Sequence, residues 1–287
     1  MARGPQRFQN RGTAPLVAQW TGSTAMAGAT GWGSVGWGSV GAFPPLGMAC
    51  AAAAVFLLAG MVKGVVGLGL PTVSMALLAL WMPPAQAAAL LVVPSLATNL
   101  WQTGPWRGVP ALLRRMAGLQ VGICAGTWAG AWWLGPPEGQ GARMALGAAL
   151  IAYAGWSLAG AHLPAVPARH QRWLGFPVGA ATGAITAATG VFVVPAVPYL
   201  QALGLQRDAL VQAMGLCFTV STIALGAGLA SQASLPPATL AVSMLLLAPA
   251  IAGMALGARL RRHLSPQAFR RCLMAGLLAL GLGLLLG

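Results

Sequence analysis

Long apolar segments follow one another along most of the chain, with short polar connectors between them. Several reach the roughly 20 residues that a helix needs to cross the apolar core of a bilayer. Their residues are continuously apolar rather than alternating, which favours helices over the strands of a membrane β-barrel. The pattern predicts an all-α fold, a polytopic transmembrane helical bundle of about 8–10 membrane segments. The ten apolar segments cover residues 46–62, 65–82, 86–101, 116–134, 143–160, 173–188, 190–203, 209–231, 238–258 and 270–286.

Composition supports a membrane protein. Of the 287 residues, 57% are hydrophobic and only 6% are charged, whereas a soluble domain has about 25% charged residues. The net charge of +14 raises the question of nucleic-acid binding. The arginines lie in short connectors, however, without a basic helix or interleaved aromatic residues. The sequence therefore predicts a lipid bilayer as partner and no nucleic acid.

The connectors predict an orientation. Those at 102–115, 161–172 and 259–271 are rich in arginine, so we expect them on the cytoplasmic side. Those at 135–142 and 232–237 contain no basic residue, and we expect them on the outer side.

The chain divides into three predicted parts. Residues 1–45, rich in Gly, Ser and Trp, are predicted to form a flexible N-terminal tail. Residues 46–160 and 173–287 form two predicted transmembrane repeats, because the stretch from Gly60 is similar to that from Gly179, 119 residues later. Five segments in each half make the repeats inverted in the membrane. Such repeats, built around broken helices, are typical of transporters with a site near the midplane.

The paired glycine stretches resemble those of the sulfite exporter TauE/SafE family of membrane transporters. Members carry a Gly-rich motif, then apolar residues and a proline, near the start of each half; the copies here are Gly60–Pro71 and Gly179–Pro195. Neither copy has the densest glycine run of the usual pattern. The resemblance covers residues 46–286. It implies a multi-pass protein of a bacterial-type inner membrane that exports sulfite, sulfonates or related small organic anions, with no cofactor.

Lys63 is the only lysine of the chain and is bracketed by apolar segments. At bilayer depth such a residue is a functional candidate; at a segment end it would instead extend to the headgroups. If residues 46–82 form a hairpin that dips into the membrane, Lys63 lies near its tip and can meet an anion. Glu138 and Asp208 are the only carboxylic side chains, and both lie in connectors. The inventory favours an anionic or neutral solute over a cation.

Glycines and hydroxyl groups complete the candidate site. Thr182, Thr186 and Thr189 share one helix face, and Ser95 with Asn99, and Thr219 with Thr222, have similar spacing. Their polar groups can donate hydrogen bonds to an oxyanion. Close helix packing is the alternative role for the glycines, and interhelical hydrogen bonding for the polar residues. The predicted substrate-binding residues are Lys63, Gly64, Gly67, Gly69, Ser95, Asn99, Thr182, Gly183, Thr186, Thr189 and Gly190.

Three other functions remain open. A transporter of a neutral metabolite would also fit ten apolar segments. A non-transporting membrane assembly protein is disfavoured by the many prolines and glycines within the segments, because broken helices usually line cavities. An intramembrane enzyme needs a nucleophile with a base, paired Asp residues or a metal-ligand cluster. The sequence contains none of these patterns, so we expect neither catalytic nor metal-binding residues.

Overall fold

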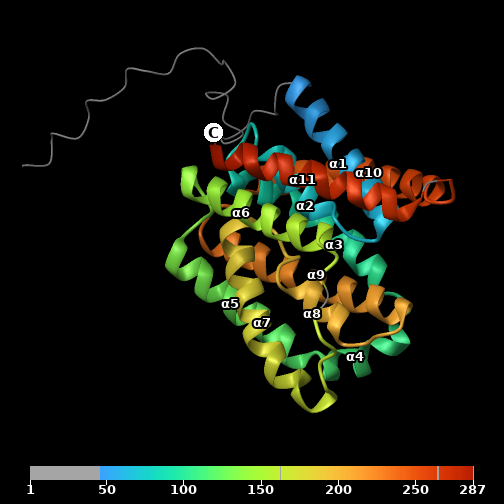
Figure 1. Ribbon diagram of the computed structural model, residues 1–287. Helices are drawn as coiled ribbons and strands as arrows, with labels where there is room; N and C mark the ends of the chain where they lie inside the picture. The colour runs from blue at the N-terminus through green and yellow to red at the C-terminus, as the bar shows by residue number, and fades with distance from the viewer. Residues whose placement is uncertain (1–45, 162, 264, 287) are drawn as a thin grey trace, which may run out of the picture. The chain divides into compact units, whose positions relative to one another are not determined.

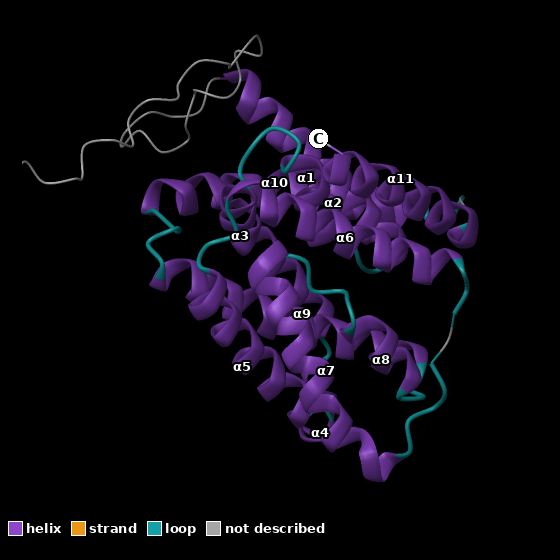
Figure 2. Cartoon of the chain, turned by 60° about the vertical axis from the view of Figure 1, so that its left-hand side comes forward, coloured by secondary structure: helices purple, strands orange, loops and turns teal. Residues whose placement is uncertain are grey.

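The computed structural model describes residues 46–286 apart from 162 and 264, and the predicted tail at 1–45 lies outside the described residues. Every described element is a helix, as predicted (Figures 1 and 2). The elements are α1 (Leu46–Val66), α2 (Leu70–Leu78), α3 (Pro84–Thr103), η1 (Trp106–Gly108), α4 (Val109–Arg115), α5 (Ala117–Leu134), α6 (Gly139–Leu158), α7 (Ala168–Thr189), α8 (Ala196–Ala202), α9 (Arg207–Ser231), α10 (Pro237–Leu260) and α11 (Pro266–Leu286).

Each of the ten predicted apolar segments overlaps one of these helices, so the hydrophobic pattern locates them correctly. The exception is the connector 102–115, which also contains η1 and α4. The pattern does not predict α4 because it is only 7 residues long and ends with two arginines. Pro110 in its first turn favours helix initiation there.

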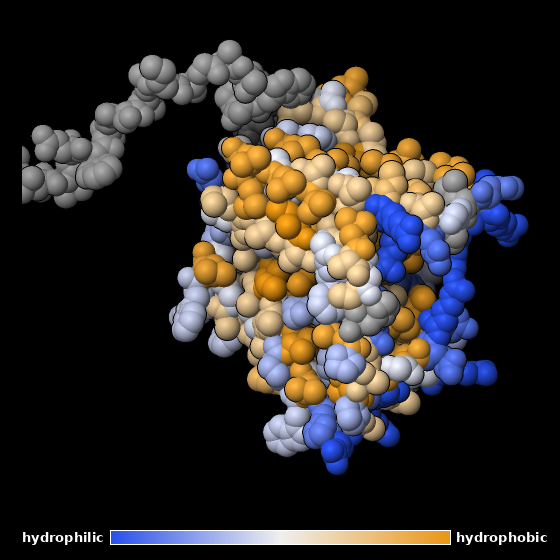
Figure 3. All heavy atoms as spheres, viewed as in Figure 1, coloured by the Kyte–Doolittle hydropathy of each residue, from blue (hydrophilic) through white to orange (hydrophobic). Residues whose placement is uncertain are grey.

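The outer surface of the bundle is largely apolar. Large hydrophobic side chains such as Trp133, Leu245 and Leu286 are exposed by 87%, 67% and 88%. Figure 3 shows extensive hydrophobic surface on the viewed face, with hydrophilic residues gathered toward its right-hand and lower edges. By length and composition, α1, α9, α10 and α11 can each span a membrane. The protein is therefore a multi-pass helical membrane protein.

The central helices are α3 and α9, which pack against each other. On one side α3 packs against α10, which packs against α1; on the other, α9 packs against α5, which packs against α7. In both ribbon views α1 and α10 accordingly lie apart from α5 and α7 (Figures 1 and 2). α6 and α11 form a further pair.

Glycines bring α1 into direct backbone contact with α10. A Cβ placed on Gly60 would lie 2.2 Å from the carbonyl oxygen of Ala250, and one on Gly64 would lie 2.3 Å from that of Met254. Any larger residue would overlap the neighbouring backbone. Small residues are what allow two helices to approach this closely in lipid.

The crossing of α7 with α5 reproduces this contact. A Cβ on Gly179 would lie 2.2 Å from the carbonyl oxygen of Leu119, and one on Gly183 would lie 2.3 Å from that of Ile123. Gly179 and Gly183 follow Gly60 and Gly64 by 119 residues. The first helix of the second half therefore packs through glycines at equivalent positions, with the same distances from the added Cβ to the neighbouring carbonyl oxygen.

Both first helices end at a glycine in the left-handed backbone region and are followed by a short helix. Between α1 and α2, Gly67 and Gly69 have φ of +85° and +113°; α7 ends at Gly190, with φ of +69°. Side chains with a Cβ rarely adopt such angles. The helical path is thus interrupted at Gly67–Gly69 and again at Gly190, after the first helix of each half.

The five predicted connectors fall into the two expected groups. Arg115, in the first basic connector, donates to the side chain of Gln171, in the second, at 2.7 Å. Ala161 of the second connector and Arg270 of the third line one cavity, so the three basic connectors lie together. The other two meet at a separate pocket that contains Glu138 and Ser234. Since α5 and α6 each run from one group to the other, the two groups lie at opposite ends of these helices.

Candidate functional site

Lys63 lies inside the bundle, near the end of α1, and is only 4% exposed. Its Nζ donates to the Thr98 hydroxyl at 3.1 Å and to the Asn99 side-chain oxygen, both on α3. In the structure Lys63 therefore does not extend to the headgroups. The chain turns back within four residues at Gly67, so Lys63 lies one turn before the tip of a hairpin, as the sequence suggested.

The hydrogen bonds continue from α3 to α9. The Asn99 amide donates to Ser95 Oγ at 3.1 Å and approaches Thr222 Oγ1 at 3.5 Å. The hydroxyls of Ser95 and Thr222 lie 3.2 Å apart. Ser95, Asn99 and Thr222 are fully buried. We call Lys63, Ser95, Thr98, Asn99 and Thr222 the lysine network.

The lysine network contains no carboxylate. The chain has only two acidic side chains, Glu138 and Asp208, and the hydrogen-bond partners of Lys63 are a hydroxyl and an amide. A buried cation normally has a counter-ion, because a charge in an apolar interior is costly. An ammonium with three N–H donors and neutral partners can bind an anion by exchanging these partners for its oxygens.

The breaks in α1 and α7 adjoin one another through α2. A Cβ on Gly190 would lie 3.0 Å from Met75 Cε, so the end of α7 touches the short helix of the first half. Gln102 donates to the carbonyl oxygens of Gly67, at 2.9 Å, and Val211, at 3.3 Å. This side chain holds the turn between α1 and α2 against α9.

The predicted glycines occupy two kinds of position. Gly64 and Gly183 lie at the crossings with α10 and α5, where the backbones touch, so their absent side chains serve close packing. Gly67, Gly69 and Gly190 lie at the two breaks. A role for any of them in binding substrate stays a prediction.

The hydroxyls of Thr182, Thr186 and Thr189 bond to their own helix. Each donates to the carbonyl oxygen four residues earlier in α7, at 2.7–2.8 Å. Thr189 Oγ1 also accepts from the backbone N–H of Val191 at 3.2 Å, which supports the break after α7. The described side chains show no hydrogen bond between these threonines and the lysine network. Their role as substrate ligands also stays a prediction.

Sequence reasoning missed Thr98, Gln102 and Thr72. Thr98 directly precedes Asn99 in the sequence, and Gln102 lies about one helical turn after it. This proximity to Asn99 is the only sequence feature that indicates either residue. Thr72 lies in the first turn of α2, fully buried, and its hydroxyl has no hydrogen-bond partner among the described residues. A buried hydroxyl without a partner is unusual, and it places an unused donor on the hairpin that carries Lys63.

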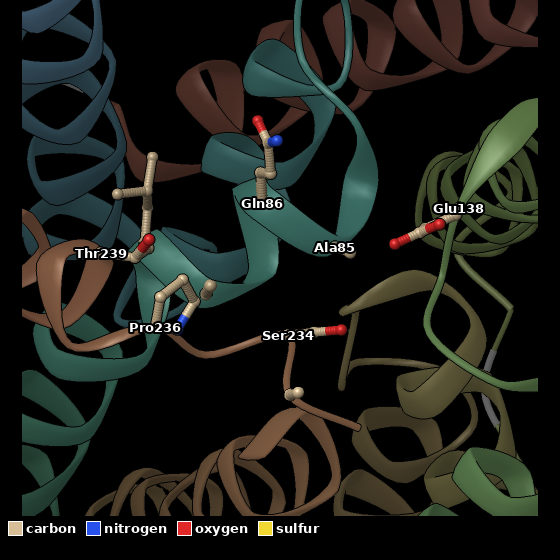
Figure 4. Close-up of a pocket in the computed structure, with 9 residues that line it drawn as sticks. Ala85, Gln86, Glu138, Ser234, Pro236 and Thr239 are labelled. Atoms are coloured by element: carbon tan, nitrogen blue, oxygen red, sulfur yellow. The ribbon is translucent and has the colours of Figure 1, made fainter. Parts of the chain in front are cut away.

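A pocket of about 210 Å³ lies at the other end of α3. Figure 4 shows Glu138 directed toward the loop that carries Ser234, with Gln86 and Thr239 on the neighbouring helices. The single charged side chain of its lining is the Glu138 carboxylate.

The family model of the sulfite exporter TauE/SafE family matches residues 51–284. The chain belongs to the sulfite exporter TauE/SafE family. The match includes both glycine breaks and the entire lysine network. TauE/SafE proteins are membrane transporters, so the protein is a multi-pass membrane transporter whose family handles small anions.

Neither the comparison with curated proteins nor that with solved structures returned a match. The TauE/SafE assignment therefore rests on the family model, in agreement with the motifs at Gly60 and Gly179.

Proposed function

We propose that this TauE/SafE protein is a secondary transporter that exports a small oxyanion, sulfite or a sulfonate, through a site at Lys63. The observation that carries the proposal is the burial of Lys63 among hydroxyl and amide groups, with no carboxylate among its hydrogen-bond partners in the described residues. Sulfite and sulfonates present three oxygens, which suit an ammonium surrounded by hydrogen-bond donors.

The pathway in this proposal lies between two inverted repeats, residues 46–160 and 173–287. The equivalent glycine crossings of α1 with α10 and of α7 with α5 support this division. So does the contact of Gly190, at the second break, with Met75 of α2, the short helix that follows the first break. Transporter sites lie typically at such a repeat interface. We place the protein in a bacterial-type inner membrane.

The distribution of charge supports export. The three basic connectors form one group of loops. At the opposite end Glu138 lines the pocket, and Arg143, near the start of α6, offsets its charge. Since basic connectors face the cytoplasm, cytoplasmic anions are attracted to that end of the bundle.

The test is uptake of radiolabelled sulfite into proteoliposomes, challenged in turn with unlabelled sulfonates, sulfate and neutral amino acids. We expect saturable uptake that sulfonates block and neutral amino acids do not. Lys63→Ala should lower it by roughly tenfold or more, the value of a hydrogen bond to a charged group, in protein that inserts and elutes as the wild type does. Lys63→Arg keeps the charge and is the matched control.

Two results would contradict the proposal. Block by neutral amino acids alone would assign the protein to a neutral solute. Unchanged kinetics in Lys63→Ala would remove Lys63 from the site.

A further inference from the structure

A cavity of about 510 Å³ lies where the end of α6, the short helix α8 and the first turns of α11 meet. It is separate from the lysine network and shares none of its residues. The polar part of its lining comes from Ser157, Gln201, Gln267, Arg270 and Arg271.

The two arginines supply positive charge that the chain does not neutralise. Arg270 donates from Nε and Nη2 to Ser157 Oγ, at 3.1 and 2.9 Å, so a neutral hydroxyl is its partner. Neither Glu138 nor Asp208 lines the cavity. A guanidinium has five N–H donors in a planar fork that matches phosphate oxygens, and most of those on Arg270 and Arg271 remain available.

Apolar and aromatic groups lie beside these charges. Trp156 is half-buried in the lining, Leu158 is 42% exposed, and Met274 is buried below the arginines. Tryptophan is enriched where a membrane protein crosses from the acyl chains to the headgroups. The cavity thus combines an apolar surface at the end of α6, suited to an acyl chain, with the two arginines of α11, suited to an anionic headgroup.

We propose that this cavity binds the phosphate group of an anionic phospholipid. Basic pockets between transmembrane helices on the cytoplasmic side are suited to such headgroups, and this one lies among the basic connectors. Arg270 and Arg271 hold the phosphate, Gln201 of α8 and Gln267 of α11 donate hydrogen bonds, and Leu158 contacts the start of an acyl chain. The bound lipid links the α6–α11 pair to α8, the short helix that follows the second break.

The test is native mass spectrometry of the full chain in a neutral detergent, titrated with phosphatidylglycerol, with phosphatidylcholine as the lipid of no net charge. The variant is Arg270→Gln with Arg271→Gln. The matched control is Arg261→Gln with Arg262→Gln, which removes the same charge from exposed positions of the same connector outside the cavity. A third arm records the melting temperature of protein without lipid after addition of either inorganic phosphate or phosphatidylglycerol.

We expect preferential binding of phosphatidylglycerol, weakened by roughly tenfold in the Arg270 and Arg271 variant and unchanged in the control. Equal weakening in both variants, or equal binding of the two lipids, would overturn the site. Stabilisation by inorganic phosphate as large as that by phosphatidylglycerol would overturn the lipid as its source and assign the cavity to soluble phosphate. If Arg270→Gln prevents folding, Arg271→Gln alone answers the question, since no hydrogen bond of Arg271 is found among the described residues.

Discussion

Ser243 on α10 donates a 2.7 Å hydrogen bond to the carbonyl oxygen of Leu90 on α3, the acceptor that Pro94 leaves without a backbone donor. A proline inside a helix has no N–H for the carbonyl four residues earlier. Ser243 Oγ also accepts from the Val93 N–H at 3.2 Å. One fully buried hydroxyl therefore repairs the hydrogen-bond ladder of a central helix.

We predict that Ser243→Ala destabilises the protein by about 1–3 kcal/mol, because it leaves a buried carbonyl without a partner. The measurement is the melting temperature in detergent. Ser231→Ala is the control, since Ser231 bonds only to a carbonyl of its own helix. Equal melting temperatures for wild type and Ser243→Ala would show that water or a backbone shift replaces the hydroxyl.

Gly64→Ala and Gly183→Ala should each destabilise the bundle, by roughly 1–3 kcal/mol. Each new Cβ would lie 2.3 Å from a backbone oxygen of the partner helix. Because the crossings are equivalent, the two losses should be similar. Gly155→Ala is the control, since a Cβ there meets nothing within 4 Å. Thermal unfolding in detergent measures all three, and a loss at only one crossing would contradict the equivalence.

Asn99→Asp should abolish most anion transport while the protein still folds. The new carboxylate would pair with the Lys63 ammonium, and such charge-assisted bonds are roughly twice as strong as neutral ones. Sulfite uptake into proteoliposomes measures the loss. Asn99→Ala, which removes the same acceptor without adding charge, is the control and should retain more uptake. If both variants lose equally, the amide itself is required and the ion-pair explanation fails.

Arg115→Ala should loosen α8. Arg115 donates from Nη2 to the carbonyl oxygen of Leu203 at 2.7 Å and from Nε to Gln171, which anchors the end of this short helix. Hydrogen-exchange mass spectrometry should show faster exchange in residues 196–203. Arg114→Ala removes the same charge from the neighbouring exposed position and should leave that exchange rate at the wild-type value. Unchanged protection in Arg115→Ala would mean that packing alone holds α8.

The sequence predicts the helices of this fold well, because apolar segments and their polar connectors are local features. Gly67 and Gly190 likewise mark the breaks, since their backbone angles exclude most other residues. The pairing of helices is not predictable in this way. Helices that face lipid on one side and protein on the other are apolar all round, so their patterns do not indicate which face is buried or against what.

The candidate site shows the same limit. The sequence makes Lys63 a candidate because apolar segments bracket it, and Asn99 because it is polar within one. Their contact joins α1 to α3 and depends on the hairpin geometry. The threonines of α7 were candidates by the same reasoning, yet their hydroxyls bond to the backbone of α7. Residue type and spacing identify a polar face; they do not distinguish a hydroxyl that stabilises its own helix from one directed at a neighbouring helix.

The crossing of α1 with α10 has a consequence for biosynthesis. About 170 residues separate the end of α1 from the start of α10, so the ribosome completes most of the chain before the glycine surface of α1 acquires its neighbour. α5 acquires α7 much sooner, because only the segment 135–167 lies between them. During translation α1 must therefore remain in the bilayer with lipid against Gly60 and Gly64. A chain truncated before Pro237 would retain the α5–α7 crossing and leave α1 without its partner.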